Sequence, residues 1–279
     1  MTVVANDRPV ICDSHVHLWS LASRFHQWPG VDLADIHRDF GLADLAALPL
    51  DRAVLVQAQP DPRETDWLLD IGARAPNVAG VVGWTALDAA DAPDAIARLA
   101  ARPGLLGLRP MLQDMPDARW ILRREQDAAI EAMVTHDLCF DALVRPRHLP
   151  AIHLLARRWP DLRIVIDHAA KPDPVNGDLD RWRLDMAELA ALPNVWCKLS
   201  GLLTELPAPA SEVLLSGCMD HVIGVFPDRL MWGSDWPVLL LSGWNYSDWL
   251  DHSLRFIQDR VPERVQGIFR SSAESFYGL

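Results

Sequence analysis

The chain alternates short runs of β-type residues with longer segments in which apolar residues recur at helical spacing. The β-type runs are rich in Val, Ile, Leu and Trp, and many are bounded by Pro, Gly, Asp or Asn, as strands often are. Eight such runs predict strands, over 10–19, 53–59, 78–87, 105–110, 138–144, 163–169, 194–201 and 229–236.

Between these runs, apolar residues recur at i, i+3 and i+4, which is the spacing of one helix face. In the segment 65–75 this face would carry Trp67, Leu68, Ile71 and Ala75. Several such segments end at Pro, which cannot continue a helix. The same spacing predicts further helices over 124–136, 151–159 and 184–192.

The order of these elements predicts the fold class. Strands that alternate with helices imply parallel βαβ units. Eight of them in 279 residues, without a Ser/Gly-rich linker, predict an α/β fold, a (β/α)8 TIM barrel with residues 1–279 as a single domain. A doubly wound open sheet is the alternative, but the glycine-rich nucleotide motifs usual in open sheets are absent from the sequence.

The amino-acid composition limits the kinds of molecule that this protein is expected to bind. The net charge of −12 and the pI near 5.2 argue against nucleic acid or an anionic membrane as a partner. The four cysteines form no C-x-x-C pair, and we find neither a signal peptide nor a run of 18 apolar residues. We therefore expect a cytoplasmic protein that acts on a small molecule.

The first predicted strand carries the motif Asp13-Ser14-His15-Val16-His17. Alternation along a strand places Asp13, His15 and His17 on one face. If that face points into a barrel, the two imidazoles lie near its C-terminal mouth and can bind one divalent ion. Alone, an H-x-H motif is weak, and two structural histidines bonded to nearby loops are the alternative.

The eighth predicted strand ends in Gly233-Ser234-Asp235-Trp236-Pro237. The first and last strands of a closed barrel are neighbours, so an inward Asp235 would lie beside His15 and His17. Gly233, on the same face, would leave room deeper in the barrel. The alternative is an aspartate that caps the following turn.

The sixth predicted strand leads into Asp167-His168-Ala169-Ala170-Lys171. Alternation puts His168 on one face with Ile164 and Ile166, and Asp167 on the other face in a structural role. Lys171 falls in the loop above the strand, where active-site residues of TIM barrels collect. A buried histidine bonded to backbone and a solvated lysine are the alternatives.

With motifs at the ends of three predicted strands, the chain resembles the amidohydrolase superfamily, in the branch of 2-pyrone-4,6-dicarboxylate lactonases and sugar lactonases. The matching pieces are DSHVHLW, VVGWTAL, GLRPMLQD, IDHAAKP, WCKLSG and MWGSDWPV, in this order from residue 11 to residue 238. The resemblance implies an active site at the C-terminal strand ends, formed by His15, His17, His168 and Asp235. It also implies hydrolysis of a sugar-acid lactone, such as an L-fucono- or L-rhamnono-lactone, in carbohydrate catabolism.

One departure from the family concerns the fifth predicted strand. Many amidohydrolases place a metal-binding Lys, Glu or His there, whereas this chain offers Asp141, Arg145 and His148, none in an obvious ligand register. A dinuclear centre is therefore not expected. The resemblance implies one divalent ion, zinc foremost, on His15, His17 and Asp235, with His168 as a further candidate ligand. It also allows a metal-free site, because some lactonases of this branch look metal-independent.

For the mechanism we expect Asp235 to act as general base on water. A metal ion or the pair His15 and His17 would polarise the lactone carbonyl, and His168 would orient the water or relay a proton. The favoured substrate is a neutral polyhydroxy lactone contacted by Arg109 and Lys171, with Trp19 and Trp236 against its ring. Alternation leaves open whether Arg109 and Lys198 face into the barrel.

Three other functions compete with lactone hydrolysis. The nearest is a metal-dependent decarboxylase of an unsaturated or aromatic acid, built on the same barrel. A non-catalytic binding barrel is disfavoured because all four site residues are intact. A serine hydrolase is disfavoured because the sequence has no G-x-S-x-G motif.

Overall fold

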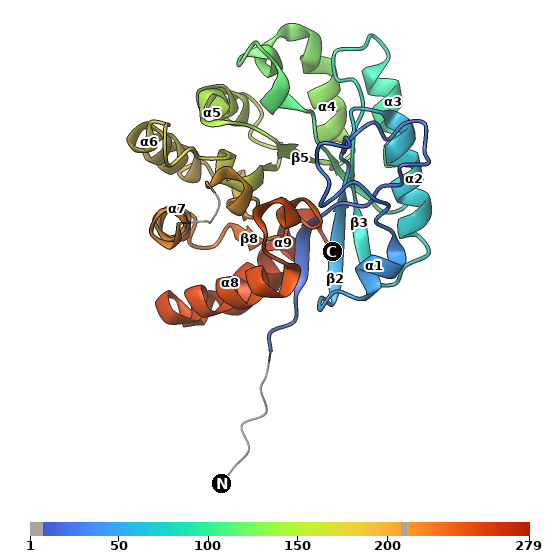
Figure 1. Ribbon diagram of the computed structural model, residues 1–279. Coiled ribbons are helices and arrows are strands. Elements are labelled where there is room, and N and C mark those ends of the chain that lie inside the picture. The colour runs from blue at the N-terminus through green and yellow to red at the C-terminus, as the bar shows by residue number, and fades with distance from the viewer. Residues whose placement is uncertain (1–7, 208–210) are drawn as a thin grey trace.

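The computed structural model describes residues 8–207 and 211–279. Its strands form one parallel sheet in chain order, in which each strand pairs with the next (Figure 1). The strands are β1 Cys12–Val16, β2 Arg52–Val56, β3 Val78–Gly83, β4 Leu105–Leu108, β5 Cys139–Ala142, β6 Ile164–Ile166, β7 Val195–Leu199 and β8 Leu230–Trp232.

The sheet closes on itself between its first strand and the segment that follows its last strand. Val16 forms a parallel bridge with Trp236. The His17 amide donates to the Trp236 carbonyl at 2.7 Å, and the Asp235 amide donates to the His15 carbonyl at 2.9 Å. The predicted (β/α)8 barrel is therefore confirmed, and its closure brings residues 15–17 beside residue 235.

Helices follow the strands along the chain and lie around the barrel (Figure 1). In the part of the chain that the structure describes, the α-helices are α1 Leu42–Ala46, α2 Pro62–Gly72, α3 Ala92–Ala100, α4 Asp127–Thr135, α5 Leu149–Arg158, α6 Leu179–Ala190, α7 Glu212–Val225, α8 Tyr246–Arg260 and α9 Ser272–Tyr277. None of the described helices is long and apolar enough to cross a membrane.

The predicted elements are present, but some of their boundaries differ from the predicted ones. Helix α2 begins three residues before the predicted 65–75, because the Asp61 side chain caps its N-terminus and Pro62 fits the first turn. Strand β8 ends at Trp232, short of the predicted 229–236, and Asp235 adopts a left-handed φ of 58°. The chemistry-bearing residues therefore lie on the turn after this strand.

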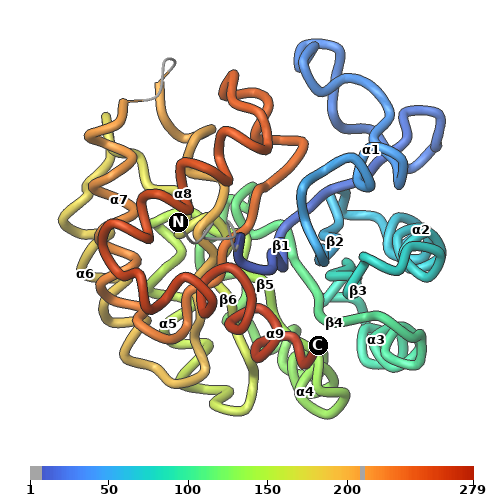
Figure 2. The backbone as a smooth tube through the Cα atoms, turned by 90° about the horizontal axis from the view of Figure 1, so that it is seen from below, coloured from blue at the N-terminus to red at the C-terminus, as the bar shows by residue number. Residues whose placement is uncertain are grey.

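Two apolar layers hold the barrel together. The outer layer packs strand residues such as Leu55, Ile166 and Trp232 against the surrounding helices. The inner layer fills the barrel with smaller residues, among them Val54, Val56, Val82, Cys139, Val165 and Met231. Phe276 and Tyr277 of α9 join this inner layer, and Figure 2 shows α9 next to the strands. The short C-terminal helix is therefore part of the barrel core.

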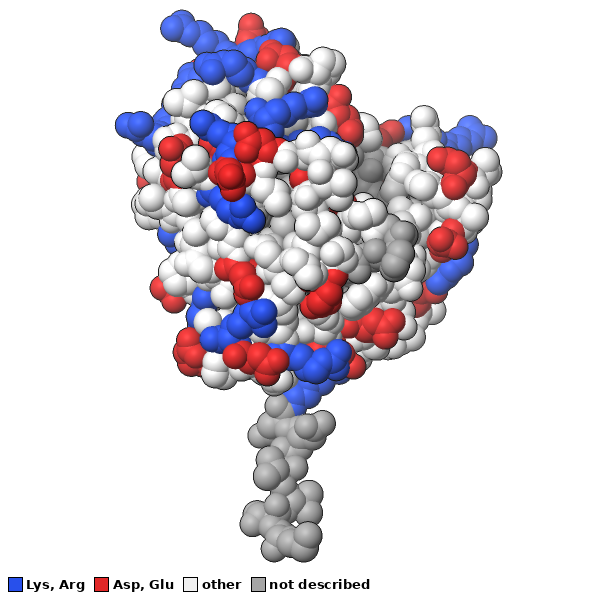
Figure 3. Space-filling model, turned by 60° about the vertical axis from the view of Figure 1, so that its left-hand side comes forward, with Lys and Arg blue, Asp and Glu red and all other residues white. Residues whose placement is uncertain are grey.

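The surface carries charges of both signs. On the face that Figure 3 shows, Lys and Arg side chains are interspersed with Asp and Glu side chains around a largely uncharged centre. That face therefore carries no continuous basic stripe.

Candidate active site

Strand β1 presents His15 and His17 at the closed seam of the barrel, but not as simple alternation predicts. The pairing of β1 with β2 is irregular between Asp13 and Val16, which changes the faces that side chains take. Asp13 consequently does not join the histidines: its Oδ1 accepts from the backbone amides of Ser234 at 2.9 Å and His15 at 3.0 Å. Asp13 ties the two sides of the seam together, so the predicted shared face is wrong for this residue.

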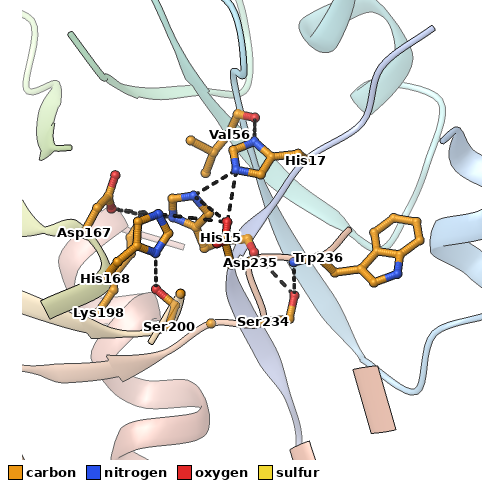
Figure 4. A network of polar contacts seen from close by, with 12 residues as sticks. His15, His17, Val56, Asp167, His168, Lys198, Ser200, Ser234, Asp235 and Trp236 are labelled. Carbon is orange, nitrogen blue, oxygen red and sulfur yellow. Dashed lines mark hydrogen bonds and ion pairs between the residues drawn. The ribbon is translucent and has the colours of Figure 1, made fainter. Parts of the chain in front are cut away.

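Both ring nitrogens of each β1 histidine have neighbours within the barrel (Figure 4). His17 Nδ1 donates to the Val56 carbonyl at 2.7 Å, which leaves Nε2 facing the site. His15 Nε2 lies 3.1 Å from His17 Nε2, and His15 Nδ1 lies 3.1 Å from Lys198 Nζ. Contacts on the Nδ1 side therefore orient both rings with Nε2 toward the site.

The turn after β6 carries His168 into the same space. Residues 168–171 all have left-handed backbone angles, with φ between 49° and 63°, which is costly for residues other than glycine. His168 Nδ1 lies 2.9 Å from the Ser200 hydroxyl, and its ring contacts that of His15 at a centroid distance of 4.5 Å. A strained turn and a hydroxyl from the β7 end thus hold this histidine in the site.

The predicted opposite orientation of Asp167 is wrong. Its carboxylate lies 3.0 Å from Lys198 Nζ and 3.5 Å from both His15 Nδ1 and Arg109 Nη1, all within the barrel. Asp167 continues the inward face of Val165, and the left-handed turn then brings His168 inward as well. Two consecutive residues therefore reach the site, which strand alternation does not allow.

Asp235 is the point on which the three histidines converge. Its Oδ1 lies 3.3 Å from His17 Nε2, 3.7 Å from His15 Nε2 and 3.9 Å from His168 Nε2. Gly233 permits this approach, because a Cβ there would come within 2.9 Å of the Cβ of His15. The room that Gly233 provides is therefore occupied by β1 itself.

Below the histidines lies a buried set of charges that the sequence did not reveal. Lys198 Nζ contacts Asp141 Oδ2 at 2.5 Å and Asp167 at 3.0 Å, and all three side chains are fully buried. The Tyr277 hydroxyl from α9 donates to Asp141 at 2.7 Å. The sequence does contain one signal for this set: a charged residue stands inside each of the otherwise apolar strands VWCKL and CFDA. Buried charges need partners, so two such residues indicate an ion pair inside the barrel.

The surroundings of the site set the charge states of its groups. Burial, helped by the charge of Lys198, lowers the pKa of His15 well below its ordinary value, and burial does the same for His168. Burial alone would raise the pKa of Asp235, but His168 and His17 outweigh it, and that pKa is lowered. His15 and His168 are therefore neutral in the site, and Asp235 is ionised.

A cavity of about 430 Å³ opens onto His17, His168 and Asp235. Arg109 and Lys171, which the sequence analysis proposes as substrate contacts, both line it. Its walls also include residues that the sequence did not single out, namely Trp28, Gln59, Met111, Gln113, Leu143 and Val238. The cavity is large enough for a small organic molecule.

The two predicted substrate tryptophans do not line this cavity. Trp19 is 1% exposed, packs against Phe40 and Trp28, and donates its indole N–H to the Arg38 carbonyl. Trp236 is 5% exposed and packs against Phe40. Trp28 faces the cavity in their place, held by a 2.9 Å hydrogen bond from Gln59 Nε2 to its carbonyl.

The candidates near the fifth strand lie away from the histidines. Arg145 pairs with Glu205 at 3.5 Å, and His148 Nδ1 accepts from the Arg145 amide at 3.1 Å. Asp141 lies among the charges below the site and pairs with Lys198. None of the three contacts Asp235 in the described structure, so they add no ligand beside it.

The converging atoms form a candidate metal site. Ligand atoms of His15, His168 and Asp235 lie within 4.8 Å of one another, and His17 Nε2 lies beside two of them. Bonds of about 2.0 Å in a tetrahedral zinc site put neighbouring ligand atoms about 3.3 Å apart. The separations of 3.1–3.9 Å between His15 and His17, and from each of the three histidines to Asp235, are close to that value. The donor set fits a divalent ion.

Comparison with known proteins places this chain in a family. The Amidohydro_2 amidohydrolase family matches residues 12–279. An L-fucono-1,5-lactonase of Burkholderia ambifaria is 49% identical over 245 residues, covering 85% of this chain and 84% of that protein. An L-fucono-1,5-lactonase of Burkholderia multivorans is 36% identical over 82% of this chain and 83% of its own length.

A solved structure supports membership of the same family. An amidohydrolase from Burkholderia multivorans, crystallised with bound zinc, superposes with a TM-score of 0.87 at 32% identity, over 97% of this chain and 99% of that one. The barrel, the three histidines around one aspartate and these relatives all agree. The chain belongs to the Amidohydro_2 family of amidohydrolases.

Proposed function

We propose that this protein is a lactonase that opens sugar-acid lactones of the L-fucono-1,5-lactone type by attack of water on the ring ester. The observation that carries the proposal is the convergence of three imidazole Nε2 atoms on the Asp235 carboxylate, at the wall of a cavity of about 430 Å³. The two relatives named L-fucono-1,5-lactonase support the same reaction.

Asp235 is the proposed general base. Its carboxylate is ionised, lines the cavity and is held in place through its backbone amide by the His15 carbonyl. It accepts a proton from water while the water oxygen bonds to the lactone carbonyl carbon. When the ring C–O bond breaks, the same carboxyl returns the proton to the departing alkoxide, and an open hydroxy acid results.

The negative charge that develops on the carbonyl oxygen needs donors within the cavity. Arg109 is 2% exposed, so its guanidinium acts in a site largely free of water. His17 and His168 line the same cavity and orient the substrate. One well-placed donor of this kind is worth about 3 kcal/mol in the transition state.

A divalent ion would be held by His15, His17 and Asp235, with His168 also within reach. Three imidazole nitrogens and one carboxylate favour zinc over magnesium or calcium, which prefer oxygen ligands. Such an ion polarises a carbonyl and lowers the pKa of bound water.

The lining of the cavity favours an uncharged, hydroxylated substrate. Trp28, Leu143 and Val238 offer apolar surface for the methyl end of a deoxy sugar, while Gln59 and Gln113 offer hydrogen bonds for hydroxyls. Of the two cations, Lys171 already pairs with Glu205 at 3.5 Å. A dicarboxylate would need more free cationic groups than this cavity provides.

The test is acid release from a panel of aldonolactones, followed in weak buffer with a pH indicator, together with elemental analysis for metal. L-Fucono-lactone should acidify the solution, and Asp235→Asn should lower kcat/KM by about 10²–10⁴-fold, the usual contribution of a general base. Asp66→Asn, an exposed residue of α2 paired with Arg102, is the matched control and should retain full activity.

Measuring the wild type before and after chelation separates the two forms of the mechanism. If activity is lost when the metal is removed, the ion activates the carbonyl. If activity persists after chelation, the protein's own donors activate it. Full lactonase activity in Asp235→Asn, or CO2 release from an acid in place of lactone opening, would refute the proposal.

A further inference from the structure

Glu205 bridges two cations at the C-terminal end of the barrel. Its Oε1 lies 3.5 Å from Lys171 Nζ, and its Oε2 lies 3.5 Å from Arg145 Nη1. The three side chains follow consecutive strands, because Arg145 comes after β5, Lys171 after β6 and Glu205 after β7. One carboxylate therefore serves both cations.

The short turn that carries Glu205, η6 Leu203–Glu205, is fixed beside the cavity. It packs against η7 Val238–Ser242, whose first residue lines the cavity. Leu203 is buried in the core and anchors the turn. The side chains of Glu205 and Lys171 are only 17% and 16% exposed, so water and salt screen their attraction weakly. Glu205 is thus held at the rim of the cavity, next to one of its cations.

The charges that line the cavity are closely balanced. Arg109 and Lys171 are the cationic side chains among its described lining residues, and Asp114 and Asp235 are the anionic ones. Arg109 already faces the fully buried carboxylate of Asp167 at 3.5 Å. Whether the cavity attracts or repels an anion therefore depends on whether the charge of Lys171 is also balanced.

This balance matters because the proposed reaction creates a charge. Water adds to the carbonyl carbon of an uncharged lactone, the ring C–O bond breaks, and the resulting hydroxy acid loses its proton at neutral pH. The new carboxylate forms beside Asp235, the proposed base, whose charge repels it. A Lys171 without Glu205 would attract that carboxylate and keep the product in the cavity.

We propose that Glu205 is a specificity-determining residue: by neutralising Lys171, it makes the cavity favour the uncharged lactone over carboxylates, the product of the reaction included. The inference rests on the proposed lactonase function and adds the charge that separates substrate from product. Carboxylate binding is measured without turnover, so a failure of this inference is distinguishable from a failure of the proposed function.

The test is a calorimetric titration of the wild type and of Glu205→Gln with two ligands. One is the open-chain aldonate made by alkaline opening of L-fucono-lactone, and the other is L-fucose, an uncharged sugar of similar size. In Glu205→Gln the Kd of the aldonate should fall about tenfold, because Lys171 is then free to pair with it. The Kd of L-fucose should stay within threefold. Unchanged or weaker aldonate binding by the folded variant, or an equal gain for both ligands, would overturn the proposal.

Two further variants locate the effect. Adding Lys171→Met to Glu205→Gln should remove the gain in aldonate affinity, and a gain that persists would mean that Lys171 is not the cation concerned. Asp117→Asn is the matched control, because it removes one carboxylate from an exposed ion pair with Arg123. Its aldonate Kd should stay within threefold of the wild type. A tenfold gain in this control would assign the effect to net charge alone and would count against the proposal.

Lactone turnover gives a second measurement of the same selectivity. In Glu205→Gln the inhibition constant of the aldonate should fall about tenfold, while KM for the lactone stays within threefold. If the protein opens no aldonolactone, the proposed function fails, whereas the calorimetric comparison still decides the role of Glu205.

Discussion

Gly201 lies directly behind His168: a Cβ at residue 201 would come within 2.4 Å of His168 Nδ1. Gly201 also adopts a left-handed φ of 59°, which a residue with a side chain rarely takes. The glycine at the end of β7 therefore decides how closely the β6 turn, and with it His168, can approach the barrel axis.

We expect Gly201→Ala to lower the free energy of unfolding by about 1–3 kcal/mol, because it adds a steric clash to a strained backbone position. His168 should also be displaced, so kcat should fall. Urea unfolding and steady-state lactonase kinetics measure the two effects. Gly217→Ala is the control: no atom lies within 4 Å of its added Cβ, and an alanine in the middle of α7 should stabilise the protein.

Ser200→Ala tests the contact that orients His168. The Ser200 hydroxyl lies 2.9 Å from Nδ1, and both side chains are buried. Loss of a contact that orients a metal-binding or catalytic imidazole typically costs 10–100-fold in metal affinity or activity. We expect a fall of that size in kcat with a small change in KM, while Ser216→Ala on the surface of α7 should behave as wild type. Equal kinetics for both variants would mean that Ser200 does not orient the ring.

The sequence predicted the barrel because its evidence is repeated along the chain. Eight apolar runs separated by helical spacing give the same answer many times over, and closure then places β1 beside β8. His15, His17 and Asp235 were brought together by that argument alone. The boundary errors at α2 and β8 did not affect it, because topology does not depend on single residues.

The faces of individual residues were less predictable. Asp13 and Asp167 were misplaced because strict alternation fails at an irregular pairing and at a left-handed turn, and neither feature is visible in residue spacing. Trp28 was missed because it lies in a long loop, where spacing carries no information. The acidic partners of Lys198 come from β5 and from the turn after β6, so only the folded chain identifies them.

Tyr277→Phe should destabilise the protein, because the lost hydroxyl donates to the buried charged group Asp141. Hydrogen bonds to charged groups contribute about 1.5–3 kcal/mol. Thermal and urea unfolding should show a loss in that range. Unaltered unfolding would mean that the carboxylate does not rely on α9 for its hydrogen bonding.

The four cysteines should be unreactive in the folded protein. Cys12, Cys139, Cys197 and Cys218 are all buried, and burial raises the pKa of Cys12 to about 12 and that of Cys218 to about 11. The thiolate is the reactive species, so these buried thiols should not react in the folded protein. A chromogenic aromatic disulfide at pH 8 should titrate no thiol in the native protein and four thiols in denaturant. Rapid reaction of one thiol in the native state would show that part of the barrel opens readily.

The buried charges around Lys198 have a consequence for synthesis. Lys198 pairs with Asp141 and Asp167, and Asp141 accepts a hydrogen bond from Tyr277. The site above these charges brings His15 beside Asp235. During translation, the seam cannot form until residue 236 has left the ribosome, and Asp141 cannot gain its Tyr277 hydrogen bond until residue 277 has followed. Because Asp235 lies in the last sixth of the chain, this enzyme should acquire its active site only late in its synthesis.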